Sequence, residues 1–368
     1  MEPKRVLHIV GNMGAGGMET LIMNLYRKID REKLQFDFLV HKPQKAFYED
    51  EIKDLGGNVY HMTVLKDWNF LKYKRDLKEF FENHKEYKVV HGHHSSLGNL
   101  YLSIAEKAGI PCRISHSHNA SFSKSIRGVV KNIIVKDYGK HASFHFACSN
   151  AAGKYMYGND EYRVVNNGID TSKFAFSVEN REKKRKELSI EEKLVVVHVG
   201  RFFDQKNHTF LIEIFSEIVK KKENSVLLLV GVGPLQENIR SKVKKLGLED
   251  KVVFMNSRND VNEILFAADL FVFPSLYEGL PLTLVEAQAA GLPVVCSNTI
   301  TDETNLTDLY CALPLTQSAE YWAKKSLEMF ENFKDSLRGD WYKEIAAKGY
   351  DIKTIAQNLQ DFYLKQYC

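Results

Sequence analysis

Short, uninterrupted apolar segments recur along the chain, and stretches with helical spacing of apolar residues separate them. A strand that is buried on both faces has a continuous apolar sequence, and such strands alternate with helices in a parallel sheet. The alternation runs through the first half of the chain, stops at a charged stretch, and then starts again. The segments expected to be strands are 6–10, 36–40, 88–93, 112–118 and 143–149 in the first series, and 193–200, 225–231, 251–255, 269–275 and 292–297 in the second.

Two such series in 368 residues predict two doubly wound α/β domains in tandem. We expect Rossmann-like domains over 1–172 and 185–350. The stretch between them, about 173–184, is charged and poor in aliphatic residues, which favours a linker, although its REKKRKEL portion has the character of a first helix. Ligands of open parallel sheets bind outside the carboxyl ends of the strands, so residues at strand ends are the candidates for function.

The composition limits the classes of protein to consider. The net charge of +4 is too small to indicate a nucleic-acid partner. The five cysteines are scattered and never have C-x-x-C spacing, which fits a reducing cytoplasm and argues against a disulfide framework or a structural zinc site. The N-terminal segment lacks the apolar core of a signal peptide, and no apolar run is long enough to span a bilayer. We therefore expect a cytoplasmic protein.

A glycine cluster and several histidines end strands of the first domain. The cluster GNMGAGGMET lets backbone N–H groups approach a ligand, but it matches neither the dinucleotide fingerprint nor the P-loop, and a plain turn is an equal alternative. His116 and His118 share one face of their strand because strand side chains alternate. A polar ligand explains the histidines as well as a metal does, since no cysteine or closely spaced carboxylate accompanies them. Core or surface histidines remain the plain alternative.

The second domain has cations after its first strand. The segment VGRFFDQKN places Arg201 and Lys206 in one short loop before an apolar-periodic helix. Arginine offers phosphate a planar fork of donors, and lysine offers a mobile point charge. A solvated loop with two cations is the plain alternative. Their position at a strand's carboxyl end favours an anionic ligand.

Further along, SLYEGLPLTLVEAQAAGLPVV contains two glutamates eight residues apart. Glu278 is expected in a loop and Glu286 in a helix that ends at Gly291, with Pro281 in its first turn. On a single helix, eight residues would separate the two carboxylates by about 12 Å, which is too far for a shared proton. The free N–H groups from Gly279 to Thr283 are suited to an anionic group.

Taken together, these segments resemble the GT-B glycosyltransferases, and most closely the retaining family-four type that assembles bacterial polysaccharides and glycolipids. The strongest element is the E-x7-E pattern from Glu278 to Glu286, followed by AQAAGLPVV. Five more segments match in the family's order: GAGGMET, VVNNGID, VGRFFDQKN, GVGPL and FMNSRNDV. The resemblance implies two Rossmann-like domains that face a deep interdomain cleft, with a C-terminal helix over 351–368 crossing back onto the first domain.

The resemblance also implies roles for individual residues. It assigns Glu286 to the ribose hydroxyls of a nucleotide sugar, Glu278 to a hydroxyl of the donor sugar, and His118 to a sugar contact. Asn256 departs from the family, which has glycine there. The residues expected to be catalytic are His118, Arg201, Lys206 and Glu278. The residues expected to bind the donor are Gly16, Gly17, Asn256, Arg258, Gly279, Leu280, Pro281, Leu282, Thr283 and Glu286.

The activity implied is transfer of a hexose or N-acetylhexosamine, most plausibly UDP-linked, to a saccharide or lipid-linked saccharide acceptor, with retained configuration, in surface polysaccharide or glycoconjugate synthesis. The chain contains no Asp-x-Asp, so cations of the protein are expected to stabilise the leaving diphosphate without a metal or other cofactor. A non-catalytic nucleotide-sugar-binding accessory subunit is the alternative. An oxidoreductase is disfavoured because Glu19 replaces the third glycine of its fingerprint.

Residues 121–141 mix basic and apolar side chains at near-helical spacing. A basic amphipathic surface of this kind is suited to anionic lipid headgroups at the inner face of the plasma membrane. An ordinary helix that buries its apolar side in the first domain is the favoured alternative. The basic residues are Lys124, Arg127, Lys131, Lys136 and Lys140.

Overall fold

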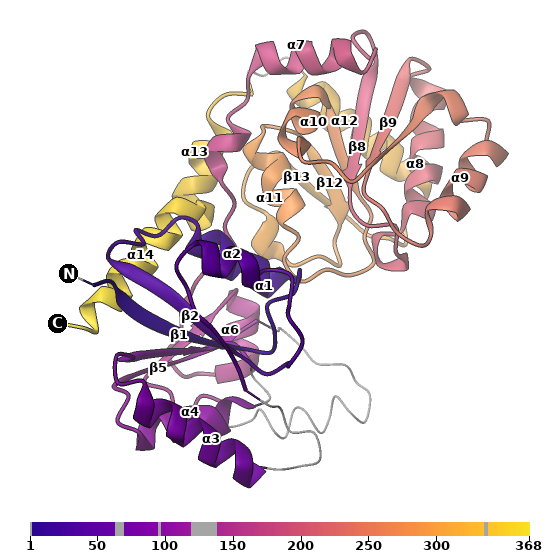
Figure 1. Ribbon diagram of the computed structural model, residues 1–368. Coiled ribbons are helices and arrows are strands. Elements are labelled where there is room, and N and C mark those ends of the chain that lie inside the picture. Colours follow the sequence, from indigo (N-terminus) through magenta and orange to yellow (C-terminus); the bar gives the residue numbers. More distant parts are fainter. Residues whose placement is uncertain (1, 63–69, 95–96, 119–137, 335–337) are drawn as a thin grey trace. The chain divides into compact units, whose positions relative to one another are not determined.

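The computed structural model describes residues 2–62, 70–94, 97–118, 138–334 and 338–368 (Figure 1). The chain forms two compact units, one of Met1–Gly168 together with Ile352–Cys368 and the other of Ile169–Asp351. Each unit contains a single sheet whose strands are all parallel, with helices on both faces. The predicted pair of doubly wound α/β domains is therefore confirmed.

The first unit has a 7-stranded sheet in the order β3-β2-β1-β4-β5-β6-β7. The direction of strand addition reverses between β1 and β4, which makes the carboxyl end of β1 the switch point where ligands of such sheets bind. Two short strands, β3 and β7, were not predicted because neither has a continuous aliphatic run. The strands are β1 (Lys4–Val10), β2 (Leu34–Val40), β3 (Val59–His61), β4 (Val89–Gly92), β5 (Cys112–Ser117), β6 (Phe144–Ala147) and β7 (Arg163–Val164).

Alternate residues of β1 supply two separate cores in this unit. Val6 and Val10 pack with α1 (Gly17–Tyr26), α2 (Glu49–Asp54) and α14 (Ile352–Lys365), whereas Leu7 and Ile9 pack with α3 (Phe70–Asn83) and α4 (Gly98–Lys107). His8 lies on the same side of β1 as Val6 and Val10. The C-terminal helix expected over 351–368 is α14, and its residues Ile355 and Leu359 are buried in the first of these cores.

The second unit has a 6-stranded sheet in the order β10-β9-β8-β11-β12-β13. One face packs against α8, α9 and α12, and the other against α10, α11 and α13. The strands are β8 (Leu194–Val199), β9 (Ser225–Val230), β10 (Val252–Asn256), β11 (Leu270–Phe273), β12 (Val294–Ser297) and β13 (Tyr310–Leu313). The helices are α8 (His208–Lys221), α9 (Gln236–Lys245), α10 (Val261–Ala267), α11 (Leu282–Ala289), α12 (Ala319–Phe333) and α13 (Trp341–Ile345).

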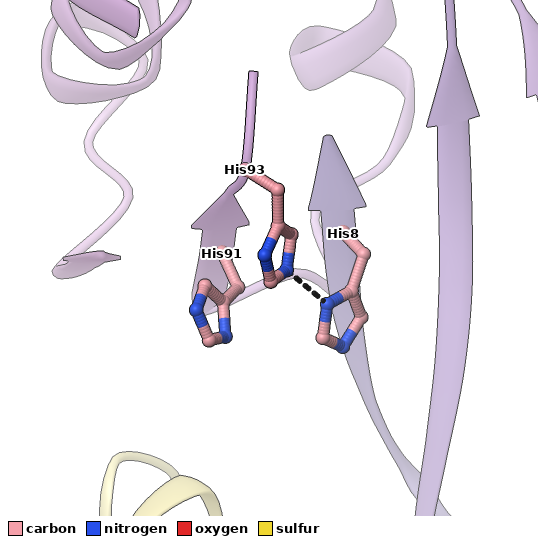
Figure 2. A group of neighbouring side chains, drawn as sticks. All are labelled: His8, His91 and His93. Carbon is pink, nitrogen blue, oxygen red and sulfur yellow. Dashed lines mark hydrogen bonds between the residues drawn. The ribbon is translucent and has the colours of Figure 1, made fainter. Parts of the chain in front are cut away.

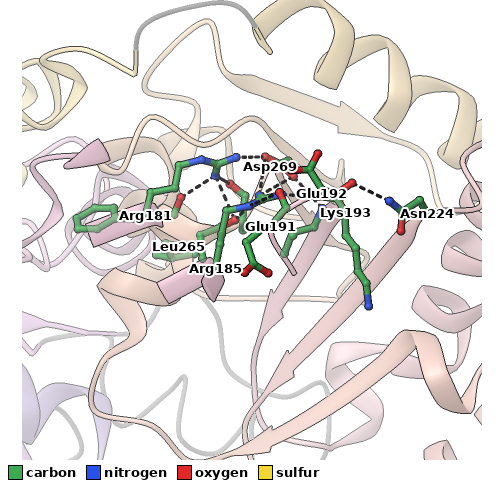
Figure 3. A network of polar contacts seen from close by, with 12 residues as sticks. Arg181, Arg185, Glu191, Glu192, Lys193, Asn224, Leu265 and Asp269 are labelled. Carbon is green, nitrogen blue, oxygen red and sulfur yellow. Dashed lines mark hydrogen bonds and ion pairs between the residues drawn. The ribbon is translucent and has the colours of Figure 1, made fainter. Parts of the chain in front are cut away.

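Much of the stretch 173–184, expected to be a linker, belongs to helix α7 (Val178–Glu187). This helix has little apolar surface, and polar contacts hold it in place (Figure 3). Arg181 lies 2.6 Å and Arg185 3.2 Å from carboxylate oxygens of Asp269, the residue before β11. Both arginines also donate to backbone carbonyls of residues 266–268, at the end of α10. These contacts satisfy carbonyl groups that a helix end leaves without partners, and composition alone does not reveal them.

The predicted basic amphipathic segment 121–141 falls mostly on residues 119–137, which lie outside the described residues. Of its basic residues, Lys124, Arg127, Lys131 and Lys136 are therefore not placed, and only Lys140 is described, in a turn. Across the described part of the chain, no helix combines the length and apolarity that crossing a bilayer requires.

Candidate functional site

Two loops of the second unit carry Lys206 and Glu278, both predicted to be catalytic. They follow β8 and β11, which are neighbouring strands, so the loops lie at the same sheet edge. The Lys206 ammonium lies 2.6 Å from one carboxylate oxygen of Glu278, and the side chain of Gln205 donates to the other oxygen at 3.0 Å. Both charged side chains are largely buried, with 17% of Lys206 and 8% of Glu278 exposed. Lys206 and Glu278 were both predicted as site residues, and the fold brings them together as an ion pair.

This ion pair is suited to bind a ligand rather than to exchange a proton. Lys206 has three N–H donors and uses one on Glu278, so others are available for a phosphate oxygen. The ammonium also lies 4.6 Å from the centre of the Phe273 ring, a cation–π contact that helps to fix its position. Gln205 fixes the carboxylate of Glu278 from the other side. Lys206 and Glu278 therefore hold each other in position in the loops that follow β8 and β11.

Arg201 is the second predicted cation, and it is exposed beside the Phe203 ring, 5.2 Å from its centre. Among the described residues, no carboxylate pairs with it. Its loop is held close to the GVGPL turn, because Phe202 donates to the Val232 carbonyl at 3.1 Å. A Cβ at Gly231 would overlap the neighbouring loop backbone, so glycine is required for this approach. The fold thus presents an uncompensated guanidinium at the strand ends.

The N-terminus of α11 forms the third part of this site. The helix begins at Leu282, so Pro281 lies just before it, not in the first turn as predicted, and accepts a hydrogen bond from the Leu284 amide at 3.0 Å. No side chain caps this helix start. The hydroxyl groups of Ser275 and Thr283 are buried without a hydrogen-bond partner in the described structure. Free amides and hydroxyls of this kind suit an anionic or hydroxylated ligand.

The residues around this helix start contribute in different ways. Gly279 is open, because a Cβ placed there would meet no atom within 4 Å. Leu280 and Leu282 direct their side chains against the apolar core of the unit, so only their backbone groups remain for a donor. Glu286 lies within α11, half-buried, and its carboxylate accepts no hydrogen bond from the described residues. Burial raises the pKa of Glu286 to about 7, so its ionisation falls in the physiological range.

Asn256 and Arg258 are predicted to bind the donor; Asn256 is the last residue of β10, and Arg258 follows that strand. Asn256 has a φ of 56°, in the left-handed region, beside a register shift in the pairing of β10 with β9. This conformation favours glycine, and asparagine tolerates it. Arg258 is bound by Asp260 at 2.6 and 2.8 Å, and Asp260 also pairs with Lys184 at 2.8 Å. The guanidinium of Arg258 is therefore already bound by a carboxylate of the protein, in contrast to that of Arg201.

In the first unit, Gly16 and Gly17 stand at the start of α1. Gly16 precedes the helix, and no side chain caps its N-terminus through a hydrogen bond. The Glu19 carboxylate folds back toward Gly16, into the space that a Cβ there would occupy. Gly17 is open on the side where a Cβ would point. The cluster therefore exposes backbone at the switch point of the sheet, with a carboxylate beside it.

Four histidines at the ends of β4 and β5 form a ladder on one face of the first sheet, and His8 of β1 joins them: His91, His93, His116 and His118. Figure 2 shows His8, His91 and His93. His8 Nδ1 lies 3.0 Å from His93 Nε2, and His93 Nδ1 lies 2.9 Å from His118 Nε2. A second chain joins His91 Nε2 to His116 Nδ1 at 3.0 Å. Burial lowers the pKa of all five rings, to about 3 for His8 and about 4 for His118. The rings are neutral at physiological pH.

Two groups within this ladder bring three ligand nitrogens within 4.8 Å of one another: His8, His91 and His93, and His93, His116 and His118. Their rings are stacked, with centroids 4.2 Å apart for His91 and His93 and also for His116 and His118. Rings that share a metal point their nitrogens at one centre, whereas these nitrogens pair with one another. Mutual hydrogen bonding describes this ladder better than metal ligation.

Two residues of these sites, Gln205 and His8, were not predicted from the sequence. Gln205 lies between the recognised residues of its loop, and nothing in the sequence distinguishes its contact with Glu278 from solvent exposure. His8 had a signal, because it is a polar residue within the apolar run VLHIV. A buried polar side chain requires a partner, and the partner here comes from a neighbouring strand.

Family profiles match both halves of this chain. A family profile described as Glycosyltransferase Family 4 matches residues 15–173, and one described as Glycosyl transferases group 1 matches residues 179–334. EpsF of Bacillus subtilis (strain 168), named as a glycosyltransferase, is 32% identical over 335 residues, which cover 87% of this chain and 86% of that protein.

Two further proteins are also similar to this chain. The UDP-Gal:alpha-D-GlcNAc-diphosphoundecaprenol alpha-1,3-galactosyltransferase of Escherichia coli is 28% identical over 278 residues, 72% of each chain. The crystal structure of Anabaena Alr3699/HepE in complex with UDP has a TM-score of 0.79 and 18% identity, covering 99% of this chain and 100% of that one. The protein therefore belongs to the family-four glycosyltransferases and has the GT-B fold.

Proposed function

We propose that the protein transfers a hexose or N-acetylhexosamine from a UDP-linked sugar to a saccharide or lipid-linked saccharide acceptor, in surface polysaccharide or glycoconjugate synthesis. The observation that carries this proposal is the Lys206–Glu278 pair beside the unpaired Arg201 and the uncapped start of α11. HepE, with the same fold, has been crystallised with UDP, and the E. coli relative is named for a UDP-galactose donor and a diphosphoundecaprenol-linked acceptor.

The proposed chemistry uses these groups as follows. Breaking the glycosidic bond leaves a nucleoside diphosphate, whose developing charge Arg201, Lys206 and the first amides of α11 stabilise. Glu278 accepts a hydrogen bond from a donor-sugar hydroxyl while Lys206 holds it in place. Glu286 accepts hydrogen bonds from the ribose hydroxyls, which supply the partners that its carboxylate lacks in the described structure.

Metal independence is part of the proposal. The protein's cations supply the positive potential that a divalent metal supplies in enzymes with an Asp-x-Asp motif, and this sequence has no such motif. Full activity is expected in excess chelator. Activity that disappears with chelator and returns only with Mg²⁺ or Mn²⁺ would contradict this part of the proposal.

Retention of the anomeric configuration is also proposed. In front-face attack the leaving phosphate takes the acceptor's proton, so no carboxylate of the protein has to act as a base. Proton NMR of the glycoside product reports the configuration of the new linkage directly. An α product from an α-linked donor is expected, and a β product would contradict retention.

The decisive experiment measures donor binding and turnover together. A panel of nucleotide sugars is screened by thermal shift, because a ligand that binds only the native state raises its stability. UDP release from the stabilising donors is then measured for the wild type and for Glu278→Gln. A glycosyltransferase releases UDP, and the variant loses this activity. A non-catalytic accessory subunit would bind the donor without turnover in either form.

We further propose a cytoplasmic location at the inner face of the plasma membrane, where a lipid-linked acceptor is available. Support comes from the basic residues of segment 121–141 and from five free cysteines, which suit a reducing compartment. Sedimentation with anionic liposomes is expected to fall when Lys124, Arg127 and Lys131 are changed to glutamate. Unchanged sedimentation of the variant would remove the membrane part of the proposal.

A further inference from the structure

Hydrogen bonds join the histidines of the first unit into two separate chains. One chain runs from His8 through His93 to His118, with nitrogen separations of 3.0 and 2.9 Å. The other runs from Tyr363 of α14 through His91 to His116. His118 stands at the outer end of the first chain and is half-buried, whereas His8 and His93 are buried. The first chain thus leads from the core to a predicted site residue.

The inner end of the first chain determines the direction of its hydrogen bonds. His8 Nε2 is buried and has no partner in the described structure, and the rings of Phe36 and Phe38 lie against His8. A neutral imidazole has one N–H donor and one bare nitrogen. A buried N–H without a partner is rarer than a buried acceptor without one. The bare nitrogen of His8 is therefore Nε2, and its proton is on Nδ1.

Each later proton position follows from this one. His8 Nδ1–H donates to His93 Nε2, so the proton of His93 is on Nδ1. His93 Nδ1–H in turn donates to His118 Nε2, so His118 carries its proton on Nδ1. Among the described residues, no group pairs with His118 Nδ1. That N–H is consequently available to a ligand.

We propose that His8 and His93 are positioning residues that fix His118 in the tautomer protonated on Nδ1, so that this ring donates a hydrogen bond to an oxygen of the bound sugar. This inference rests on the proposed function for the identity of the ligand, but the tautomer itself does not. The ligand group is a hydroxyl or ether oxygen with a free lone pair. His118 acts in this arrangement as a donor and not as a proton acceptor.

Two further observations agree with a fixed donor. Burial keeps the pKa of His118 at about 4, so the ring remains neutral and keeps a single N–H at physiological pH. The second chain fixes the orientation of the ring, because His116 stacks on His118 at 4.2 Å and is itself held by His91. A ring with fixed plane and tautomer offers its N–H in one direction only.

The test is the protonation state of His118 in the full-length protein labelled with ¹⁵N-histidine. Long-range ¹H–¹⁵N spectra distinguish a protonated ring nitrogen from a bare one, and His118→Gln identifies the signals. A protonated Nδ1 and a bare Nε2 are expected for His118 across pH 6 to 8. The same spectra are then recorded for His93→Leu, which removes the donor, and for His93→Gln, whose amide N–H replaces it.

A matched control is His116→Phe, which keeps the stacking on His118 but lies outside the first chain. His93→Leu is expected to shift the proton of His118 toward Nε2 and to lower kcat/KM for the donor about tenfold, the value of one hydrogen bond. His93→Gln and His116→Phe are expected to keep the Nδ1–H signal, and His93→Gln to recover most of the activity.

Three outcomes would overturn the inference. The first is a wild-type His118 with its proton on Nε2, or with both nitrogens protonated at pH 7. The second is a His118 signal that His93→Leu leaves unchanged. The third is stoichiometric zinc in the purified protein with metal-bound histidine shifts, which would make the ladder a metal site. If the tautomer is as expected but no nucleotide sugar is turned over, the proposed function fails and the positioning stands.

Discussion

The two sheets of this protein share a strand order around their first strands, yet they present opposite chemistry at the ends of those strands. In the first unit, His8, His91, His93 and His116 are buried, His118 is half-buried, and the five neutral rings bind mainly to one another. In the second unit, Lys206 and Glu278 are charged and paired, and Arg201 is charged and exposed. One sheet therefore offers fixed hydrogen-bond donors and the other offers positive potential.

The difference shows how a parallel sheet adjusts its ligand surface without a change in topology. A histidine ladder tolerates burial because each imidazole supplies one donor and one acceptor to its neighbours. Charged groups tolerate partial burial only when they are paired, as Lys206 and Glu278 are. The neutral edge suits recognition of sugar oxygens, and the charged edge suits a diphosphate.

The largest expected effect comes from breaking the ion pair. Lys206→Ala removes a proposed diphosphate contact and leaves the Glu278 carboxylate partly buried without its cation. We expect kcat to fall by about 10² to 10³ and the free energy of unfolding to fall by about 1–3 kcal/mol. Steady-state UDP release and urea denaturation measure these effects. The matched control is Lys220→Ala, since Lys220 forms an exposed pair with Glu217, and it is expected to change neither quantity measurably.

The next effect distinguishes Arg201 from Arg258. Arg201→Ala is expected to weaken UDP binding about tenfold, because a charge-assisted contact to phosphate is lost. Its melting temperature is expected to stay unchanged, since no carboxylate among the described residues pairs with Arg201. Arg258→Ala breaks the two bonds to Asp260 and is expected to lower the melting temperature more than the affinity. Calorimetric titration and thermal unfolding of both variants test this contrast, and equal effects on affinity and stability would contradict it.

The titration of Glu286 is expected to affect the stability of the free protein. Its carboxyl group has a pKa of about 7 in the folded protein, against 4.5 ordinarily. As pH rises between these values, the unfolded chain ionises first, so this group lowers the stability of the free protein. Glu286→Gln is therefore expected to match the wild type at pH 4 and to be more stable at pH 8, by up to about 3 kcal/mol.

The same titration affects donor binding. Only an ionised Glu286 accepts both ribose hydroxyl groups, so wild-type affinity for UDP is expected to fall as pH is lowered from 8 to 6. The Glu286→Gln variant reports any titration of the ligand's own phosphate and serves as the control. Identical pH profiles for the two proteins would show that Glu286 does not contact the ribose.

The smallest effect concerns Asn256 and its left-handed backbone. Asn256→Gly is expected to leave stability within about 0.5 kcal/mol of the wild type, because glycine adopts this conformation without strain. Asn256→Val is expected to cost about 1–2 kcal/mol, because a β-branched side chain is strained there. Equal stability of the two variants would show that the backbone relaxes at this position.

The sequence by itself determined the fold class and most of the strands. It also identified Lys206 and Glu278, which meet in the loops that follow β8 and β11. Buried parallel strands have continuous apolar sequences, so the segments 6–10 and 193–200 are recognisable without a structure. The loop position of Glu278 and the helical position of Glu286 followed from local signals in the same way. These are properties of contiguous residues, and contiguous residues are what a sequence displays.

Only the tertiary structure decided which partner each polar group has. The sequence does not show that Asp260 pairs with Lys184, which lies 76 residues earlier in the chain. The charged stretch around α7 has the composition of a linker, but Asp269 and the end of α10 hold it as a helix. The ladder likewise depends on the register of β1 with β4 and of β4 with β5. Burial and pairing depend on residues far apart in the chain, and these set the charge of Glu286 and the tautomer of His118.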